Sequence, residues 1–335
     1  MPYLRGAPTS VSMVAGKVCE RSIDGLRALA VLGVIAYHAN WLPGSIGARG
    51  VDLFFVISGL CLSLPVLRAG RELQRSKFWI NRFWRIVPVF WIALGMFALL
   101  SLTPFGLPSA LVPKRAFELP QEALFFTGFT PAYNSSFWTL EFETHWYIFF
   151  PFILVLFMKS RPWFFALLVG LYLWYLTPVR VPDAGMLPCF MLGIVAADLY
   201  LRKMIDSKFV LAAAAAFLAL AIVLRGNSND HGDPLWHVAA FCVVLAGLGV
   251  ASKALSWEPL AFIGVASYSI YLIHGPVLAW MHDTLHLPMF LAALGSLAAG
   301  ILFWLLVERP ISKPEFRTAV TSLFSWRPKP SATTP

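Results

Sequence analysis

Long apolar runs, separated by short polar stretches, occur along almost the whole chain. A membrane-spanning helix needs about 20 mostly apolar residues, whereas a membrane β-barrel is built from shorter segments that alternate apolar and polar positions. Segments such as 209–224 are apolar on every face, so the pattern predicts an all-α membrane protein, a polytopic bundle of about ten transmembrane helices. The expected spans lie at approximately 28–42, 50–67, 86–104, 137–157, 163–177, 186–200, 209–224, 236–252, 259–280 and 288–307.

The composition supports an integral membrane protein. The 335 residues are 59% hydrophobic and 13% charged, with a mean hydropathy of +0.71, unlike an ordinary soluble domain. We expect one transmembrane domain over 1–310 and a basic cytoplasmic tail, partly disordered, over 311–335. No cleavable signal peptide is expected, because a polar stretch precedes the first apolar run, which ends without a small-residue cleavage pattern.

Positive residues gather on one side of the expected spans. With both termini in the cytoplasm, 21 of the 26 Lys and Arg residues fall on the cytoplasmic side and 5 on the opposite side. The positive-inside rule therefore predicts cytoplasmic termini. The net charge of +9 is then explained by positive residues that lie beside the membrane lipid on the cytoplasmic side. No nucleic-acid partner is expected.

Two ionisable residues stand deep in apolar sequence around the first outer loop. On insertion scales such a residue costs roughly 2.5 to 3.5 kcal/mol, so it needs a polar partner or a task. His38 lies past the midplane of the first expected span, and Asp52 opens the second. We expect them to meet in the outer half of the membrane, with the carboxylate orienting the imidazole as a general base. A pair that only satisfies a helix interface is the alternative interpretation.

The fourth expected span carries three ionisable residues within five positions. Glu141 and His145 are four residues apart and share a helix face, whereas Glu143 points roughly 160° away from Glu141. We therefore expect one carboxylate to be structural and the other to line a cavity.

The ninth expected span places a second histidine at membrane depth. His274 lies at a depth similar to that of His38, and Ser267 and Tyr271 follow along the same helix face. These side chains are expected to line a cavity or contact an acceptor. A satisfied core histidine is the alternative interpretation of His274.

An arginine pair precedes the third expected span, in the stretch 75–88. Arg82 and Arg85 are three residues apart and therefore neighbours on one helical face. With Arg27 available nearby, these guanidinium groups suit phosphates, to which they make charge-assisted bidentate bonds. The alternative is an ordinary positive-inside loop with interfacial aromatic residues.

Six blocks of this sequence, taken in order, resemble the signatures of the acyltransferase-3 family of bacterial integral membrane proteins. The resemblance covers residues from about 20 to 310, and six ordered blocks are more specific than any one alone. The blocks are DGLRALAVLGVIAYH (24–38), GVDLFFVISG (50–59), NRFWRIVP (81–88), FWTLEFETHWYIFFP (137–151), SYSIYLIHGPV (267–277) and VERP (307–310).

The resemblance implies a ten-helix enzyme of the bacterial cytoplasmic (inner) membrane. Such an acyltransferase takes an acyl group, usually acetyl, from cytoplasmic acyl-CoA and places it on a hydroxyl of a sugar or related acceptor. Acyl-CoA is then a co-substrate, and neither a permanently bound cofactor nor a metal is expected. A cell-envelope glycan is the expected acceptor, with a small secreted product such as a macrolide as the alternative.

The resemblance also carries functional positions onto this chain, namely Arg27, His38, Asp52, Arg82, Arg85 and Glu143. The sequence departs from the family pattern directly afterwards, where Thr144 and His145 replace the typical Glu and Gln, so the part played by His145 is left open. Many relatives continue into a soluble hydrolase-like domain after the last span. We expect such a partner to be separate here, or not required.

These observations combine into one mechanism and one rival. The arginines hold the CoA phosphates, the pantetheine arm carries the thioester inward, and His38, oriented by Asp52 or Glu143, removes the acceptor proton. An acyl-imidazole intermediate on His38 is the alternative route. The rival function is a transporter of a lipid-linked sugar or anionic solute, with the buried His and carboxylates as a proton relay. It predicts inverted repeats and broken helices, and the sequence contains no internal repeat of fixed period.

Overall fold

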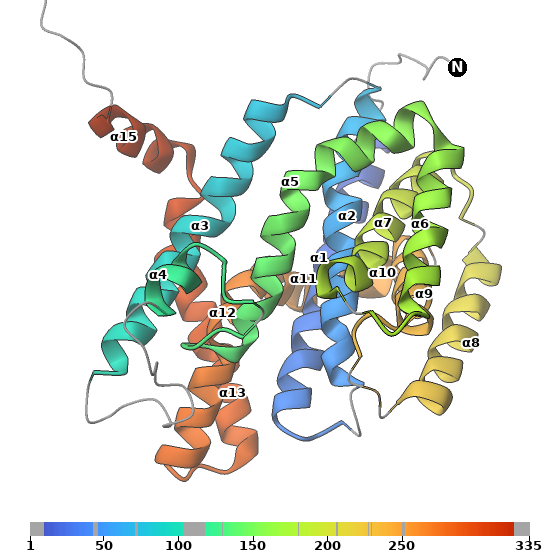
Figure 1. Ribbon diagram of the computed structural model, residues 1–335. Coiled ribbons are helices and arrows are strands. Elements are labelled where there is room, and N and C mark those ends of the chain that lie inside the picture. Colours follow the sequence, from blue (N-terminus) through green and yellow to red (C-terminus); the bar gives the residue numbers. More distant parts are fainter. Residues whose placement is uncertain are drawn as a thin grey trace, which may run out of the picture.

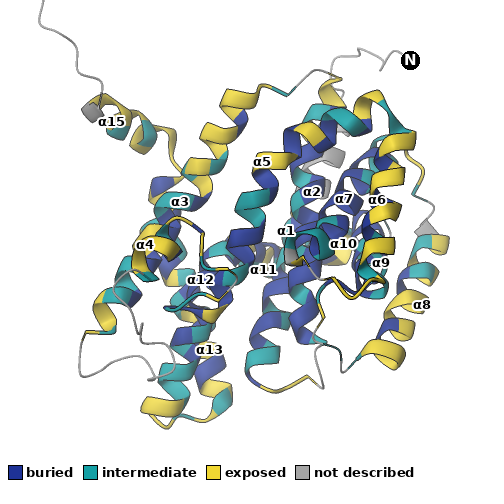
Figure 2. Cartoon of the chain, viewed as in Figure 1, coloured by how far each residue is buried: buried dark blue, intermediate teal, exposed yellow. Residues whose placement is uncertain are grey.

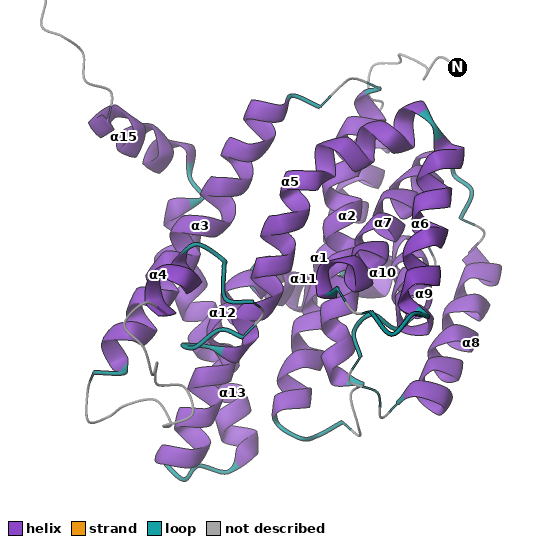
Figure 3. Ribbon diagram, in the orientation of Figure 1, coloured by secondary structure: helices purple, strands orange, loops and turns teal. Residues whose placement is uncertain are grey.

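The structure is a computed structural model that describes residues 10–42, 46–70, 73–102, 118–128, 130–179, 181–205, 207–226, 228, 230–249 and 252–324. These residues form helices and loops, without a strand among them (Figure 3). The longer helices are α1 (Ser10–His38), α2 (Gly50–Ala69), α3 (Arg75–Leu100), α5 (Trp138–Lys159), α6 (Arg161–Tyr175), α7 (Pro182–Leu201), α8 (Ser207–Arg225), α9 (Pro234–Leu248), α12 (Ser267–Ala279) and α13 (Met289–Phe303). The shorter elements are η1 (Gly47–Arg49), α4 (Glu118–Ala123), η3 (Ser135–Phe137), α10 (Ser252–Leu255), α11 (Glu258–Val265), η4 (Trp280–Thr284), η5 (Trp304–Glu308), α14 (Arg309–Ile311) and α15 (Pro314–Phe324). The all-α fold is confirmed.

Each of the ten expected spans falls on a helix or a pair of helices. Within the described residues, six helical segments are long and apolar enough to cross a membrane: Gly47–Ala69, Arg75–Leu100, Ser135–Lys159, Asp183–Leu201, Lys208–Arg225 and Met289–Ile311. The pair Glu258–Val265 and Ser267–Thr284, bent by 73°, makes a seventh when counted as one broken span. The protein is therefore a multi-pass membrane protein, whereas the count of ten and the orientation stay predictions.

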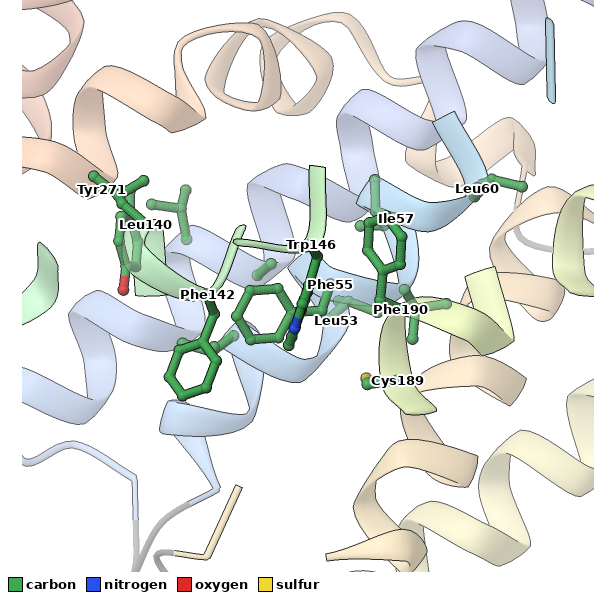
Figure 4. Close-up of a cluster of buried hydrophobic side chains, with 14 of the residues drawn as sticks. Leu53, Phe55, Ile57, Leu60, Leu140, Phe142, Trp146, Cys189, Phe190 and Tyr271 are labelled. Carbon is green, nitrogen blue, oxygen red and sulfur yellow. The ribbon is translucent and has the colours of Figure 1, made fainter. Parts of the chain in front are cut away.

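Helix α2 runs through the middle of the bundle and packs against α1, α7 and α9 (Figure 1). Its sequence is apolar on every face, and it is buried along most of its length (Figure 2). Phe55 of α2 meets the ring of Trp146 edge to face at 4.6 Å between centroids, and Trp146 lies 5.6 Å from Phe190 of α7 (Figure 4). Aromatic packing therefore joins α2, α5 and α7 into one core.

Two glycines let α2 and α7 approach closely. A Cβ atom on Gly59 would lie 2.1 Å from the backbone oxygen of Phe190, and one on Gly193 would lie 2.2 Å from that of Val56. Small residues at a helix crossing permit such contact between backbones in a membrane. The crossing fixes how α2 is placed against α7.

Helix α8 has the opposite burial pattern. It is as apolar as α2, yet only 11% of its most apolar 18-residue window is buried inside the protein, and it lies at the edge of the bundle (Figure 2). Exposed apolar side chains such as Phe209 and Val223 are what a lipid-facing helix requires.

The chain continues after the last span into α15, which extends away from the bundle (Figure 1). Residues 314–324 of the expected tail are therefore helical. The disorder expected at the end of the tail concerns 325–335, which lie outside the described residues.

Candidate active site

Three arginines come together around one cavity of about 100 Å³, which we call the arginine-lined cavity. Arg85 is exposed, Arg82 is partly buried, and the Arg27 side chain is 23% exposed. The guanidinium groups thus lead from the surface inward, and the expectation that these three residues lie near one another is confirmed.

Local structure explains how the arginines are held. Helix α3 begins at Arg75, eleven positions before the start of the expected span, so Arg82 and Arg85 are one turn apart on a regular helix. The Arg82 guanidinium lies 5.8 Å from the ring centroid of Tyr147, a cation–π contact. Arg27 donates to the Asp24 carboxylate at 2.8 Å, which orients its side chain.

The carboxylates of α5 divide as the helix periodicity predicts. Glu143 lines the arginine-lined cavity and accepts hydrogen bonds from Ser58 Oγ at 2.9 Å and from the Tyr147 hydroxyl. Glu141 is buried and instead accepts hydrogen bonds from residues 127–128, the shortest from a threonine hydroxyl at 2.6 Å. One carboxylate therefore holds a loop and the other faces a cavity, as expected.

A second and wider cavity, of about 570 Å³, lies at the end of α1, and we call it the histidine-lined cavity. His38 contributes to its wall, and so does His231 from the loop between α8 and α9. The other lining residues are mostly aromatic or hydroxyl-bearing, and include Tyr37, Thr130, Ser135, Ser136, Trp138 and Tyr271.

The two cavities share wall residues. Val51 and Tyr271 line both of them. The Tyr271 hydroxyl donates to the backbone oxygen of Ser136 at 3.0 Å and accepts from Thr139 Oγ1 at 2.9 Å. Tyr271 thus stands at the boundary between the cavity lined by the arginines and the cavity lined by His38. Figure 4 shows its ring beside Leu140 of α5.

Neither expected carboxylate contacts His38. Asp52 is fully buried, and its oxygens lie 3.4 Å from Arg49 Nη1 and 3.4 Å from His231 Nδ1. The expectation that Asp52 pairs with His38 was wrong, because α2 turns this carboxylate toward α9 and its preceding loop. Glu143 was the other expected partner, and it bonds to Ser58 and Tyr147 instead.

The described neighbours of the His38 ring are other rings. Its centroid lies 5.2 Å from that of Tyr37 and 5.1 Å from that of His274. The expected similarity in depth of the two histidines is confirmed, since α1 and α12 bring them side by side.

The segment between α8 and α9, together with Arg49, contributes residues that the sequence interpretation missed. Arg49 donates to the backbone oxygens of Asp230, at 3.0 Å, and of Ser228, and its guanidinium lies 5.0 Å from the Trp236 ring centroid. This clamp holds the loop that carries His231 into the histidine-lined cavity. Arg49 was one of only five positive residues on the expected outer side, which was the available signal.

The remaining expected site residues fall in different places. Ser267 lines the arginine-lined cavity and Tyr271 lines both cavities. His274 is fully buried behind His38. His145, whose part the sequence left open, lines neither of these two cavities, and its Nδ1 lies 3.1 Å from Asp183 Oδ2.

The chain belongs to the acyltransferase-3 family, whose acyltransferase domain matches residues 20–309. Among curated proteins it is similar to peptidoglycan O-acetyltransferase OatA of Listeria monocytogenes, with 27% identity over 92% of this chain and 59% of the relative. It is also similar to the putative peptidoglycan O-acetyltransferase YrhL of Bacillus subtilis, with 28% identity over 93% of this chain and 58% of the relative. The chain thus spans about three fifths of the length of these relatives. No solved structure matches it.

Proposed function

We propose that this protein is a membrane O-acetyltransferase that moves an acetyl group from cytoplasmic acetyl-CoA to a hydroxyl of a cell-envelope glycan. The observation that carries the proposal is that an arginine-lined and a histidine-lined cavity share the wall residues Val51 and Tyr271. The similarity to peptidoglycan O-acetyltransferases supports the choice of acetyl and glycan. The bacterial cytoplasmic membrane is the location that this reaction requires.

The donor side suits an acyl-CoA. Arg27, Arg82 and Arg85 offer bidentate donors to the phosphates of CoA. The first residue of α12, Ser267, lines the same cavity, so the positive end of that helix dipole adds to the attraction for anions. The cavity is small, with a volume of about 100 Å³, so we place the slender pantetheine arm inside it and the nucleotide outside.

The acceptor side suits a sugar. Trp138 and Tyr37 supply aromatic surface, and Ser135 supplies a hydroxyl, in a cavity several times larger than the first. His38 removes the proton from the acceptor hydroxyl as its oxygen attacks the thioester carbonyl. The new C–O ester bond forms, the C–S bond breaks, and the imidazolium returns its proton to the departing CoA thiolate. Water must be kept from the thioester, because it would hydrolyse the acyl donor. The Tyr271 side chain lies between the two cavities, where it would limit the passage of water from one to the other.

The test uses membranes that contain the full chain, radiolabelled acetyl-CoA and a soluble N-acetylglucosamine tetrasaccharide as the acceptor. His38→Gln should reduce label transfer at least about 100-fold, because the general base is removed. His286→Gln is the matched control, since this histidine is exposed and lies outside both cavities. Full activity in the His38 variant would refute the proposed base.

The same assay separates transfer from transport. The 73° break between α11 and α12 is a feature that the transport interpretation also predicts. Uptake of labelled solute into sealed vesicles without any acetylated product would favour a transporter and count against the proposed enzyme.

A further inference from the structure

A buried histidine lies directly behind His38 with one nitrogen unused. His274 Nδ1 lies 2.8 Å from the backbone oxygen of Tyr271. A carbonyl oxygen only accepts, so Nδ1 must carry the proton, and in the neutral ring Nε2 is an acceptor. Nε2 has no hydrogen-bond partner among the described residues, and the side chain is fully buried.

Such an orphaned acceptor is costly. A buried polar atom without a partner loses its hydration without compensation, which costs about 1–3 kcal/mol. Buried polar groups of this kind are rare, and those that occur call for an explanation in function. A second orphan, the Ser136 hydroxyl, lies beside the same stretch of α12, 3.4 Å from the position a Cβ would take on Gly275.

The ring of His38 is the polar group that can reach this nitrogen. The two ring centroids are 5.1 Å apart with an interplanar angle of 55°. Two imidazoles that share an N–H···N bond of about 3 Å have centroids about 5 Å apart. The spacing therefore already fits such a bond, and a rotation of the partly exposed His38 ring would align it.

We propose that His274 is the positioning residue of His38, with Nε2 accepting a hydrogen bond from one His38 ring nitrogen. This bond leaves the other His38 nitrogen unprotonated and directed at the acceptor hydroxyl. As His38 takes that proton, its remaining N–H stays bonded to His274, which stabilises the imidazolium. His274 thus has the place that sequence reasoning assigned to a carboxylate.

A neutral acceptor differs from a carboxylate in its consequences. An ionised partner would favour protonated His38 before substrate arrives, whereas a neutral imidazole orients the ring with a weaker bias toward its charged form. In a membrane site this avoids a buried charge, which is expensive without a counter-ion. Among the described residues, the titratable side chains whose rings lie against that of His274 are His38 and Tyr271.

The test compares substitutions of His274 in the acetyl-transfer assay, and it rests on the proposed function. His274→Phe keeps the ring shape and removes Nε2, so kcat should fall about 30- to 100-fold while KM for acetyl-CoA changes less than about twofold. His274→Gln places an amide oxygen near the position of Nε2 and should recover at least about tenfold of that loss. The shorter side chain in His274→Asn still donates to the Tyr271 carbonyl but does not reach His38. Its kcat should therefore fall as much as that of His274→Phe.

A purely structural His274 would give a different result. The proposal is overturned if His274→Phe retains activity within about threefold of wild type. It is also overturned if His274→Gln is no more active than His274→Phe and His274→Asn. On a His38→Gln background, His274→Phe should cause no further loss, and an additional loss would also overturn it. Failure of the proposed function is distinguishable, because wild type would then transfer no acetyl group at all.

Discussion

At the residue scale, Glu122 shows how one buried acid supports the site from outside the spans. It is 1% exposed, and its Oε2 accepts from the backbone N–H groups of Ala132, at 2.8 Å, and Tyr133, at 3.1 Å. These residues belong to the segment that leads to Ser135 and Ser136 of the histidine-lined cavity. Glu122 therefore fixes part of that wall.

Burial raises the pKa of Glu122 from 4.5 to about 7. A folded-state pKa above the unfolded one favours the protonated folded form, so this contribution to stability is complete below pH 4.5 and is lost as the pH rises through about 7. Wild type should lose at most about 3 kcal/mol of unfolding free energy over that interval. Thermal unfolding of the detergent-solubilised protein at pH 5 and pH 8 measures the loss.

Two variants make this pH prediction specific. Glu122→Gln is neutral at every pH and still accepts both backbone hydrogen bonds, so its unfolding temperature should change much less between the two pH values. Glu315→Gln, on the exposed part of α15, should behave like wild type. Equal pH dependence in wild type and Glu122→Gln would contradict the role given to burial.

The site was predictable from the sequence in part. The spacing of Arg82 and Arg85, the division between Glu141 and Glu143 and the depth of His274 all follow from helix periodicity, which is a local property. The partner of His38 was not predictable, because it depends on how α1 rotates against α2 and α12. Opposite charge and nearness in sequence favoured Asp52, yet its helix face points elsewhere.

At the element scale, the crossing of α2 and α7 depends on the absence of side chains. Gly193→Ala would place a Cβ 2.2 Å from a backbone oxygen that cannot rotate away, so the helices must separate. We expect a loss of about 2–3 kcal/mol, measured as a lower unfolding temperature and reduced accumulation in membranes.

The matched control for this crossing is Gly95→Ala on α3. A Cβ at Gly95 has no atom within 4 Å among the described residues, so this change should be neutral or stabilising by up to about 1 kcal/mol through helix propensity. If Gly193→Ala were as neutral as Gly95→Ala, the backbones of α2 and α7 would have space for a side chain at their crossing, which would contradict this prediction.

The sequence predicted where the helices lie better than it predicted the residues at which they begin, end or bend. Runs of apolar residues located the six or seven segments of the described chain that are long and apolar enough to cross a membrane, because a bilayer imposes helices on apolar segments. It did not predict that α3 would begin at Arg75, since polar residues outside the bilayer core leave no hydropathy signal. The 73° break before Ser267 was missed for the opposite reason, because hydropathy stays high across it.

At the scale of the whole molecule, the proposed function gives the arginine-lined cavity to the donor and the histidine-lined cavity to the acceptor. Arg85→Gln should raise KM for acetyl-CoA about 10- to 100-fold with a smaller change in kcat, because it removes a charge-assisted contact to phosphate at the mouth. Arg68→Gln is the control, since this exposed arginine at the end of α2 does not line the cavity. The measurement is the initial rate in inside-out vesicles, where added acetyl-CoA reaches the cytoplasmic face. An unchanged KM would place the donor elsewhere.

The clamp made by Arg49 has a consequence for protein engineering. Arg49 donates to the backbone carbonyl oxygens of Ser228 and Asp230. Every amino acid supplies the same carbonyl, so this part of the anchorage is independent of the side chains, whereas Asp230 accepts a hydrogen bond from Tyr175 and His231 lies against Asp52 through their side chains. On the proposed function, acceptor preference should therefore be exchangeable by grafting a segment of equal length that keeps Asp230 and His231, while the donor half of the catalyst is left untouched.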